Sequence, residues 1–235
     1  MTDKKIIALI GGLGPLAGSD VLRKIFEYAA LGYGAMNDAD YPNVVLVSQG
    51  LSDFDETGNI SPLFESEILS VVDRLELHHP TLMGMACNTA HLYIDSIHQH
   101  TKAQFINIIE ATVQEAAKQK GHYLILSSST TRRSGLYYNE FDKQNVDYSD
   151  INNEEQAVVD NIIGLVMVNK ISEANKISGD LIEKLAAKYP HATGVIAGCT
   201  ELPIAFSNVS FSGDLTIIES NSCLAKALVD AYYDI

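Results

Sequence analysis

The sequence predicts an α/β fold made of two similar lobes, each a parallel sheet flanked by helices. Short apolar runs alternate with longer segments whose apolar residues recur at helical spacing, and this alternation is typical of parallel strands joined by helices. Two segments also resemble one another: 79–89 and 189–200 each contain a helix end, an apolar run, a cysteine and then a hydroxyl or amide residue. This internal echo predicts two lobes of similar plan, each presenting one cysteine.

The first half of the chain contains four predicted strands, each followed by a helix. Glycines and a proline at 11–15 interrupt the pattern after the first apolar run and predict a loop. The strands are predicted at residues 5–10, 43–48, 81–86 and 105–109. The helices are predicted at residues 19–30, 62–79, 89–100 and 111–120, each with apolar residues on one face.

The second half repeats the alternation. Its strands are predicted at residues 123–127, 194–197 and 215–218, and its helices at 154–168, 172–189 and 222–232. A polar turn is predicted at 128–131, and the polar composition of 142–153 predicts a surface excursion. Functional residues are expected where strands end, because parallel strands place their C-terminal ends at one edge of the sheet.

Composition and charge exclude several classes of function. Hydrophobic residues make up 46% of the chain, yet no apolar run is long enough to cross a membrane. The net charge of -14 repels a phosphate backbone, and Arg132 and Arg133 form the only adjacent arginine pair, so no nucleic-acid partner is expected. The first residues lack the cleavage pattern of a secretory signal, so a cytoplasmic location is expected.

Cys87 and Cys199 are the candidates for catalysis. Each lies at the end of a predicted strand. A cysteine at a strand's end, just before a helix, lies near backbone N–H groups and the helix dipole, which lower a thiol pKa from its free value of about 8.5. Two such thiols facing one cleft could work as a pair: a thiolate removes the α-proton from one face of a carbon, and a thiol returns a proton to the other face. Cys223 has no polar motif behind it and is predicted to be a buried apolar residue.

No metal site is predicted. None of the three cysteines lies in a CxxC pair of zinc-site spacing. Five histidines share one neighbourhood, but most are assigned to two helical surfaces: His78, His79, His91, His98 and His100.

Two polar loops have alternative interpretations. Gly12, Leu13 and Gly14 lie in a GxGxxA pattern, but Pro15 sits inside the turn and the next strand lacks the acidic residue that would hold a ribose. The glycines either let backbone N–H groups approach a small anion or serve tight-turn packing. The hydroxyl residues at 128–131 either bind a carboxylate or cap a helix.

Taken together, these motifs resemble the aspartate/glutamate racemase family in order and spacing. The resemblance extends over nearly the whole chain and includes the family's crossover between lobes at 108–112. It is carried by Gly11-Gly12-Leu13-Gly14-Pro15, Met85-Ala86-Cys87-Asn88-Thr89-Ala90-His91, Ser134-Gly135-Leu136-Tyr137 and Gly198-Cys199-Thr200-Glu201-Leu202-Pro203.

The resemblance implies a homodimer of two-lobed subunits, with an amino-acid site in the cleft between lobes and neither pyridoxal phosphate nor metal. The implied lobes are 1–109, onto which 210–235 packs back, and 110–209. Cys87 and Cys199 carry over as the two catalytic thiols. The positions implied to bind the substrate's carboxylate or amino group are Asn88, Thr89, Thr131 and Thr200, with the loop from Gly12 to Gly14. Glu201 and His91 are implied to tune or orient the cysteines, with helix packing an equal alternative for His91.

Two positions depart from the family pattern, and both are positions where family members bind the side-chain carboxylate of the substrate. Glu56 stands where aspartate racemases commonly have an arginine, and a family lysine falls at Asn169, with Lys170 beside it as a substitute. An acid at 56 would repel aspartate, whereas a buried carboxylate needs a positive or donor-rich partner.

Aspartate or glutamate is the first candidate substrate, and a neutral or basic amino acid is the alternative. Other enzymes of the superfamily, such as a hydantoin racemase or maleate isomerase, and a catalytically idle amino-acid-binding relative are further alternatives. An arylmalonate decarboxylase is disfavoured because that reaction needs only one of the two cysteines.

Overall fold

The computed structural model describes residues 4–52, 60–207, 209 and 215–233. The chain divides into two compact units: unit 1 is Met1–Ile108 with Asn221–Ile235, and unit 2 is Ile109–Ser220. Within the described ranges, no helix is both long enough and apolar enough to span a bilayer.

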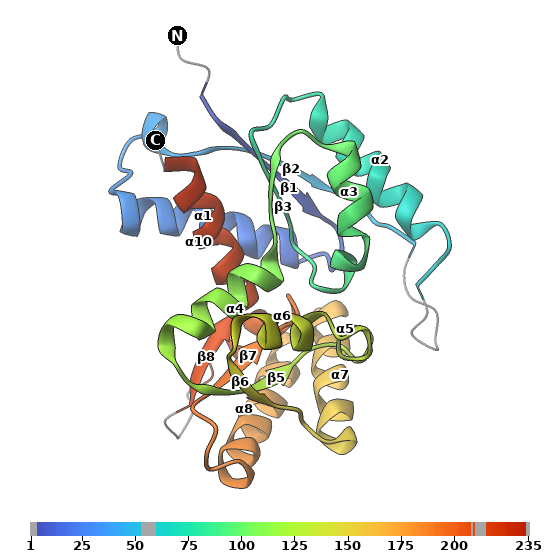
Figure 1. Ribbon diagram of the computed structural model, residues 1–235, viewed down its shortest axis with the longest axis vertical. Coiled ribbons are helices and arrows are strands. Elements are labelled where there is room, and N and C mark those ends of the chain that lie inside the picture. Colours follow the sequence, from blue (N-terminus) through green and yellow to red (C-terminus); the bar gives the residue numbers. More distant parts are fainter. Residues whose placement is uncertain (1–3, 53–59, 208, 210–214, 234–235) are drawn as a thin grey trace. The chain divides into compact units, whose positions relative to one another are not determined.

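Unit 1 is built on a four-stranded parallel sheet in the order β2-β1-β3-β4. Its strands are β1 (Ile6–Gly11), β2 (Asn43–Ser48), β3 (Leu82–Met85) and β4 (Gln104–Ile106). Its helices are α1 (Ala17–Tyr33), α2 (Phe64–Glu76), α3 (Ile94–His100) and α10 (Ser220–Tyr233), with short 3₁₀ helices η1 (Asp38–Asp40) and η2 (Thr89–Tyr93). In Figure 1, α1 and α10 lie on one side of this sheet, and α2 and α3 lie on the other.

Side chains along each strand of this sheet point alternately to its two faces. Ile10 pairs with Met85, and both side chains are fully buried in the cluster formed with α2 and α3. Gly84 points to the opposite face, where an added Cβ would lie 3.0 Å from Leu228 of α10. A glycine at 84 therefore allows α10 to pack closely on β3.

Unit 2 repeats the plan with the strand order β6-β5-β7-β8, again all parallel. Its strands are β5 (His122–Leu126), β6 (Asp147–Ser149), β7 (Gly194–Ala197) and β8 (Thr216–Glu219). Its helices are α4 (Ile108–Gln119), α5 (Ser129–Ser134), α6 (Leu136–Gln144), α7 (Asn153–Met167), α8 (Ile171–Lys188) and α9 (Leu202–Phe206). The predicted α/β fold with two parallel sheets is confirmed, and the predicted strands at 43–48 and 194–197 match β2 and β7.

Two local predictions were wrong, and a third was right in its bounds. The segment 142–153, predicted as a surface excursion, contains the end of α6 and the edge strand β6. The segment 128–131, predicted as a turn, starts helix α5, and α9 was not predicted. The helix predicted at 89–100 begins as the 3₁₀ helix η2 and continues as α3.

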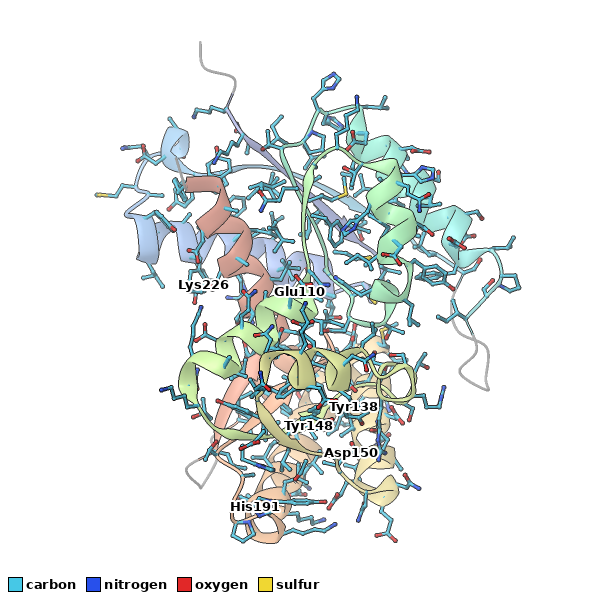
Figure 2. The ribbon with its side chains drawn as sticks, viewed as in Figure 1. Glu110, Tyr138, Tyr148, Asp150, His191 and Lys226 are labelled. Atoms are coloured by element: carbon cyan, nitrogen blue, oxygen red, sulfur yellow. The ribbon has the colours of Figure 1, made fainter. Side chains whose placement is uncertain are left out.

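Strand β6 escapes a pattern-based prediction because it is short and polar. It pairs only with β5, so its side chains need not be apolar on both faces. Its Tyr148 stacks on Tyr138 of α6, with ring centroids 5.5 Å apart and planes 16° apart (Figure 2). An aromatic contact, rather than an aliphatic run, therefore attaches this edge strand to unit 2.

Candidate functional site

The glycine loop after β1 is shaped by a close backbone approach. Gly12 has φ +87°, and a Cβ at this position would lie 2.1 Å from the carbonyl oxygen of Gln49. Gly14 also has a positive φ of 102°, and the Leu13 side chain packs against the core of unit 1. Packing against the segment after β2 therefore accounts for glycine at 12 without a ligand. Binding of a substrate by Gly12, Leu13 and Gly14 stays a prediction.

Cys87 leaves the sheet at the same edge as this loop. β1 and β3 are neighbours, and the Ala86 N–H donates to the Ile10 carbonyl at 2.9 Å, two residues before the glycine loop begins. Cys87 is partly buried against the apolar core, whereas Asn88 and Thr89 are buried at 2% and 5% exposure. Buried amide and hydroxyl groups at a strand's end are suited to hold a polar ligand beside the thiol.

His91 links Cys87 to the start of α4. The Ile108 N–H donates to His91 Nε2 at 3.3 Å, so Nε2 is the acceptor and Nδ1 carries the proton. Nδ1 lies 2.8 Å from the carbonyl oxygen of Cys87 and donates to it. Burial lowers the pKa of His91 to about 4, only partly offset by its backbone hydrogen bonds, so the ring is neutral at physiological pH. The neutral tautomer therefore fixes the backbone that carries the thiol.

Replacing His91 with glutamine is expected to change the pH dependence of stability. The histidine has a pKa of about 6.5 in the unfolded state and about 4 in the folded state. Between these two pH values the unfolded state binds a proton that the folded state does not, so the free energy of unfolding falls as the pH falls through this window. The free energy of unfolding of the wild type should fall by about 3 kcal/mol more than that of His91→Gln between about pH 7 and about pH 4. Urea unfolding at several pH values measures this difference.

His78→Gln provides the control, because His78 is exposed. This variant should follow the wild-type pH dependence. Parallel curves for the wild type and His91→Gln would show that the ring is not held neutral by the fold.

Cys199 occupies in unit 2 the place that Cys87 occupies in unit 1. β5 and β7 are neighbours, and the Gly198 N–H donates to the Leu126 carbonyl at 2.8 Å. A Cβ at Gly198 would lie 2.6 Å from the Tyr137 ring, so the chain beside the cysteine has room only for glycine. The loop after β5 and the thiol after β7 therefore leave the sheet of unit 2 at the same edge. The glycine loop after β1 and Cys87 after β3 have the same arrangement in unit 1.

Glu201 directly contacts the Cys199 thiol. The Cys199 S–H donates to Glu201 Oε2 at 3.1 Å, and the Thr200 hydroxyl donates to the same oxygen at 3.2 Å. All three residues are buried, at 9%, 2% and 5% exposure for Cys199, Thr200 and Glu201. A carboxylate in this position favours the protonated thiol, because a thiolate beside it would place two negative charges together in a buried site.

Thr131 lies in the first turn of α5, which Ser128 caps. The Ser128 Oγ accepts from the Thr131 N–H at 3.2 Å and donates to the Thr131 Oγ1 at 3.1 Å. Of the two interpretations of the hydroxyl cluster, the structure shows the helix cap. Thr131 is 1% exposed, and its predicted role in substrate binding stays a prediction.

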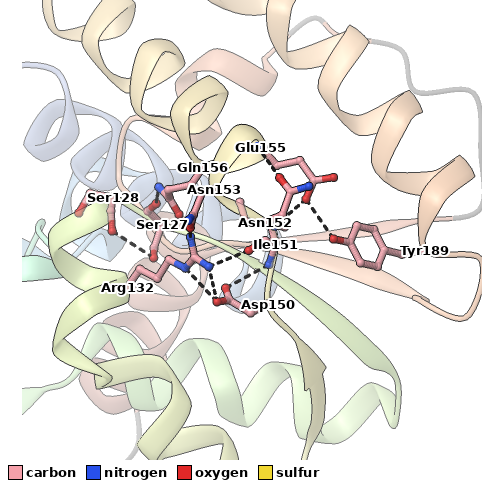
Figure 3. Close-up of polar contacts among 10 residues, drawn as sticks. All are labelled: Ser127, Ser128, Arg132, Asp150, Ile151, Asn152, Asn153, Glu155, Gln156 and Tyr189. Carbon is pink, nitrogen blue, oxygen red and sulfur yellow. Dashed lines mark hydrogen bonds and ion pairs between the residues drawn. The ribbon is translucent and has the colours of Figure 1, made fainter.

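Two residues that the sequence analysis missed hold this loop in place. Gln156 of α7 donates through Nε2 to the Ser127 carbonyl at 2.8 Å (Figure 3). Asp160, one turn later, accepts from the Ser129 N–H at 3.0 Å and from its hydroxyl. Periodicity could have placed Gln156 on the inner face of α7, since it precedes the buried Val159 by three positions, but could not have identified its partner.

Lys170 is the predicted substitute for the family's lysine, and its role in substrate binding stays a prediction. Lys170 is exposed and pairs with Glu173 at 3.4 Å. Asn169 has φ +59° where the chain turns from α7 into α8, a left-handed conformation that asparagine tolerates well. A turn residue therefore replaces lysine at the aligned position. Glu56 lies outside the described residues.

The elements that follow the two thiols bear on the predicted thiol pKa values. Cys87 is followed by a 3₁₀ helix, and Cys199 by the five-residue helix α9. Both elements are short, although η2 continues directly into α3, and the predicted effect of the helix termini on the thiol pKa values stays a prediction. Cys223 is buried at 8% exposure, as predicted. Among the described residues, no three His, Cys, Asp or Glu side chains are grouped to hold a metal ion.

Comparisons with known proteins agree over almost the full length of the chain. A family model described as Asp/Glu/Hydantoin racemase matches residues 10–228. A broad specificity amino-acid racemase from Bacillus subtilis, RacX, is 25% identical over 227 residues, which cover 97% of this chain and 98% of the relative.

Two solved structures have a similar fold over almost the full length of the chain. An aspartate racemase from Picrophilus torridus superposes with a TM-score of 0.78 and 26% identity, covering 97% of this chain and 94% of that chain. An aspartate racemase homologue from Pyrococcus horikoshii gives a TM-score of 0.76 at 23% identity, covering 98% and 100% of the two chains. The second likeness concerns the fold alone.

Proposed function

Because this chain belongs to the Asp/Glu/hydantoin racemase family of cofactor-independent amino-acid racemases, we propose that it inverts the α-carbon of an amino acid with Cys87 and Cys199 as paired acid and base. The supporting observation is the equivalence of the two thiols. Each follows the third strand of its own parallel sheet, next to a strand that ends in a loop predicted to bind the substrate. Cys223 has no such setting.

In the proposed reaction, the two thiols act on opposite faces of one carbon. A thiolate takes the α-proton, so that the C–H bond breaks, an S–H bond forms, and the electron pair is delocalised into the substrate's carboxylate. The opposite thiol then gives its proton to the other face of the carbon and becomes the thiolate. The reverse reaction exchanges the two roles.

The contacts of Cys199 support a proposal for the starting roles. Its S–H donates to the Glu201 carboxylate, so Cys199 starts as the thiol and Cys87 as the thiolate. Glu201 then acts as a positioning residue: it orients the S–H and holds the proton when Cys199 must act as a base. His91 holds the backbone of Cys87 through a hydrogen bond, and its ring stays neutral throughout the proposed reaction.

Asn88, Thr89, Thr131 and Thr200 are proposed to bind the carboxylate or amino group of the substrate, together with the loop from Gly12 to Gly14. Aspartate or glutamate is the first candidate substrate, supported by the likeness to an aspartate racemase. A neutral or basic amino acid is the second, supported by the exposed Lys170–Glu173 pair and by a relative of broad specificity.

A panel of L-amino acids in deuterated water tests the activity and identifies the substrate. We expect at least one to gain deuterium at the α-carbon as its D-enantiomer forms. Release of carbon dioxide would identify a decarboxylase. An unchanged panel would mean either an idle binding protein or an enzyme that acts on another class of substrate, such as a hydantoin racemase or maleate isomerase. Either result would overturn the proposal.

Replacing Glu56 with arginine is expected to favour aspartate. If the acid at 56 repels the distal carboxylate, Glu56→Arg should raise kcat/KM for aspartate on the order of tenfold, which corresponds to about 1.4 kcal/mol. Glu183→Arg, the same charge change on the exposed surface of α8, is the matched control. Equal rates for Glu56→Arg and the wild type would exclude charge at this position as the specificity determinant.

A further inference from the structure

Unit 2 contains an open cavity with charged and polar side chains in its lining, separate from the candidate catalytic residues. Its volume is about 500 Å³, and residues of α5, α6, the segment after β6 and α7 form its walls. Its lining includes Ser129, Arg132, Tyr138, Asp150, Gln156 and Asp160. Cys199, Thr200 and Thr131 do not line it. The residues of α5 that line it are 129, 132 and 133, so the cavity lies along a different face of this helix from Thr131.

The walls are held by paired charges. Arg132 donates through Nε and Nη2 to Asp150 Oδ2 at 2.9 and 2.6 Å, and through Nη2 to the Ile151 carbonyl at 2.7 Å (Figure 3). Burial raises the pKa of Tyr138 to about 12, so its hydroxyl keeps its proton. Asp160 is anchored by Ser129. A preformed site of this kind loses little conformational entropy on binding.

Gln156 supplies the observation that points to a ligand. Both partners of its Nε2, the Ser127 carbonyl and Asp160 Oδ1 at 3.1 Å, are acceptors, so the amide cannot be turned around. Its Oε1 is buried and has no hydrogen-bond donor among the described residues. The residue is 5% exposed. An unsatisfied buried acceptor is costly, and an N–H or O–H donor from a ligand would satisfy it.

We infer that this cavity binds a small zwitterion with a primary ammonium and a carboxylate, such as a free amino acid. Two guanidinium groups, of Arg132 and Arg133, and two carboxylates, of Asp150 and Asp160, line the cavity, so a ligand with one charge of each sign matches it. The ammonium donates to Gln156 Oε1 and lies beside Asp160. The carboxylate faces Arg133, which is exposed.

Titration with glycine, followed by amide NMR shifts, tests this inference in the full-length Cys87→Ala protein, where turnover cannot interfere. Glycine betaine is the matched probe, because it keeps the carboxylate but has no N–H donor. We expect saturable shifts at the amides of 129, 133 and 156–160 with glycine, and at least tenfold weaker binding of betaine. Equal binding of the two probes would overturn the role of Gln156.

Two variants complete the test. Arg133→Gln should weaken glycine binding at least tenfold, and Arg74→Gln, an arginine variant in unit 1, should bind as the parent does. Shifts confined to Thr131 and Thr200, or no saturable shift at all, would overturn the site. Because the titration does not depend on turnover, its failure is distinct from a failure of the proposed racemase activity.

Discussion

Replacing either Cys87 or Cys199 with alanine is expected to abolish racemization. Acid–base catalysis by a positioned side chain contributes about 10²–10⁴-fold, and inversion requires both thiols in every turnover, so each variant should fall at least by this factor. Chiral analysis of the product measures the loss. Each variant should still exchange the α-proton of the one enantiomer that faces its remaining thiol.

Cys223→Ala is the matched control for both variants. Cys223 is buried at 8% exposure in α10 and has no role in the proposed reaction, so this variant should keep wild-type kcat/KM. A loss of activity in Cys223→Ala equal to that of the other two would show that the wrong thiols had been assigned. Retained racemization in Cys87→Ala or Cys199→Ala would do the same.

Replacing Glu201 with glutamine is expected to have the next largest effect. Glutamine keeps the size of the side chain and an acceptor for the Cys199 S–H, but it cannot hold the thiol's proton. We expect kcat/KM to fall by about 10²-fold. The fall must be equal in both directions, because two enantiomers have the same free energy in water.

The pH dependence of kcat/KM separates this role from a purely structural one. Cys199 and Glu201 share a hydrogen-bonded proton, so we expect Glu201→Gln to change the shape of the profile. Glu201→Asp keeps the carboxylate and should retain the shape. Glu154→Gln, an exposed carboxylate at the start of α7, should change neither rate nor shape. An unaltered profile in Glu201→Gln would contradict the proton-holding role.

The sequence predicted the architecture because apolar strands leave a strong pattern. Strands β2 and β7 could be placed to the residue, since each is an apolar run bounded by polar or turn residues. The echo between 79–89 and 189–200 also has a structural basis, because β3 and β7 hold the same place in two sheets of equal strand order.

The parts that escaped prediction depend on contacts between distant residues. β6 is stabilised by pairing with β5 and by the stacking of Tyr148 on Tyr138, neither of which has a local signal. The tautomer of His91 depends on Ile108, seventeen positions away, and the anchoring of Ser127 depends on Gln156. Short-range periodicity carries no information about such partners.

The timing of deuterium incorporation tests most directly whether two thiols act on opposite faces of one carbon. The L-enantiomer of the active substrate is incubated in deuterated water, and both enantiomers are recovered at low conversion. With two thiols, the new D-enantiomer carries deuterium while the recovered L-enantiomer keeps its original proton. Deuterium entering the recovered L-enantiomer as fast as the product would mean that one group serves both faces, and would contradict the proposed mechanism.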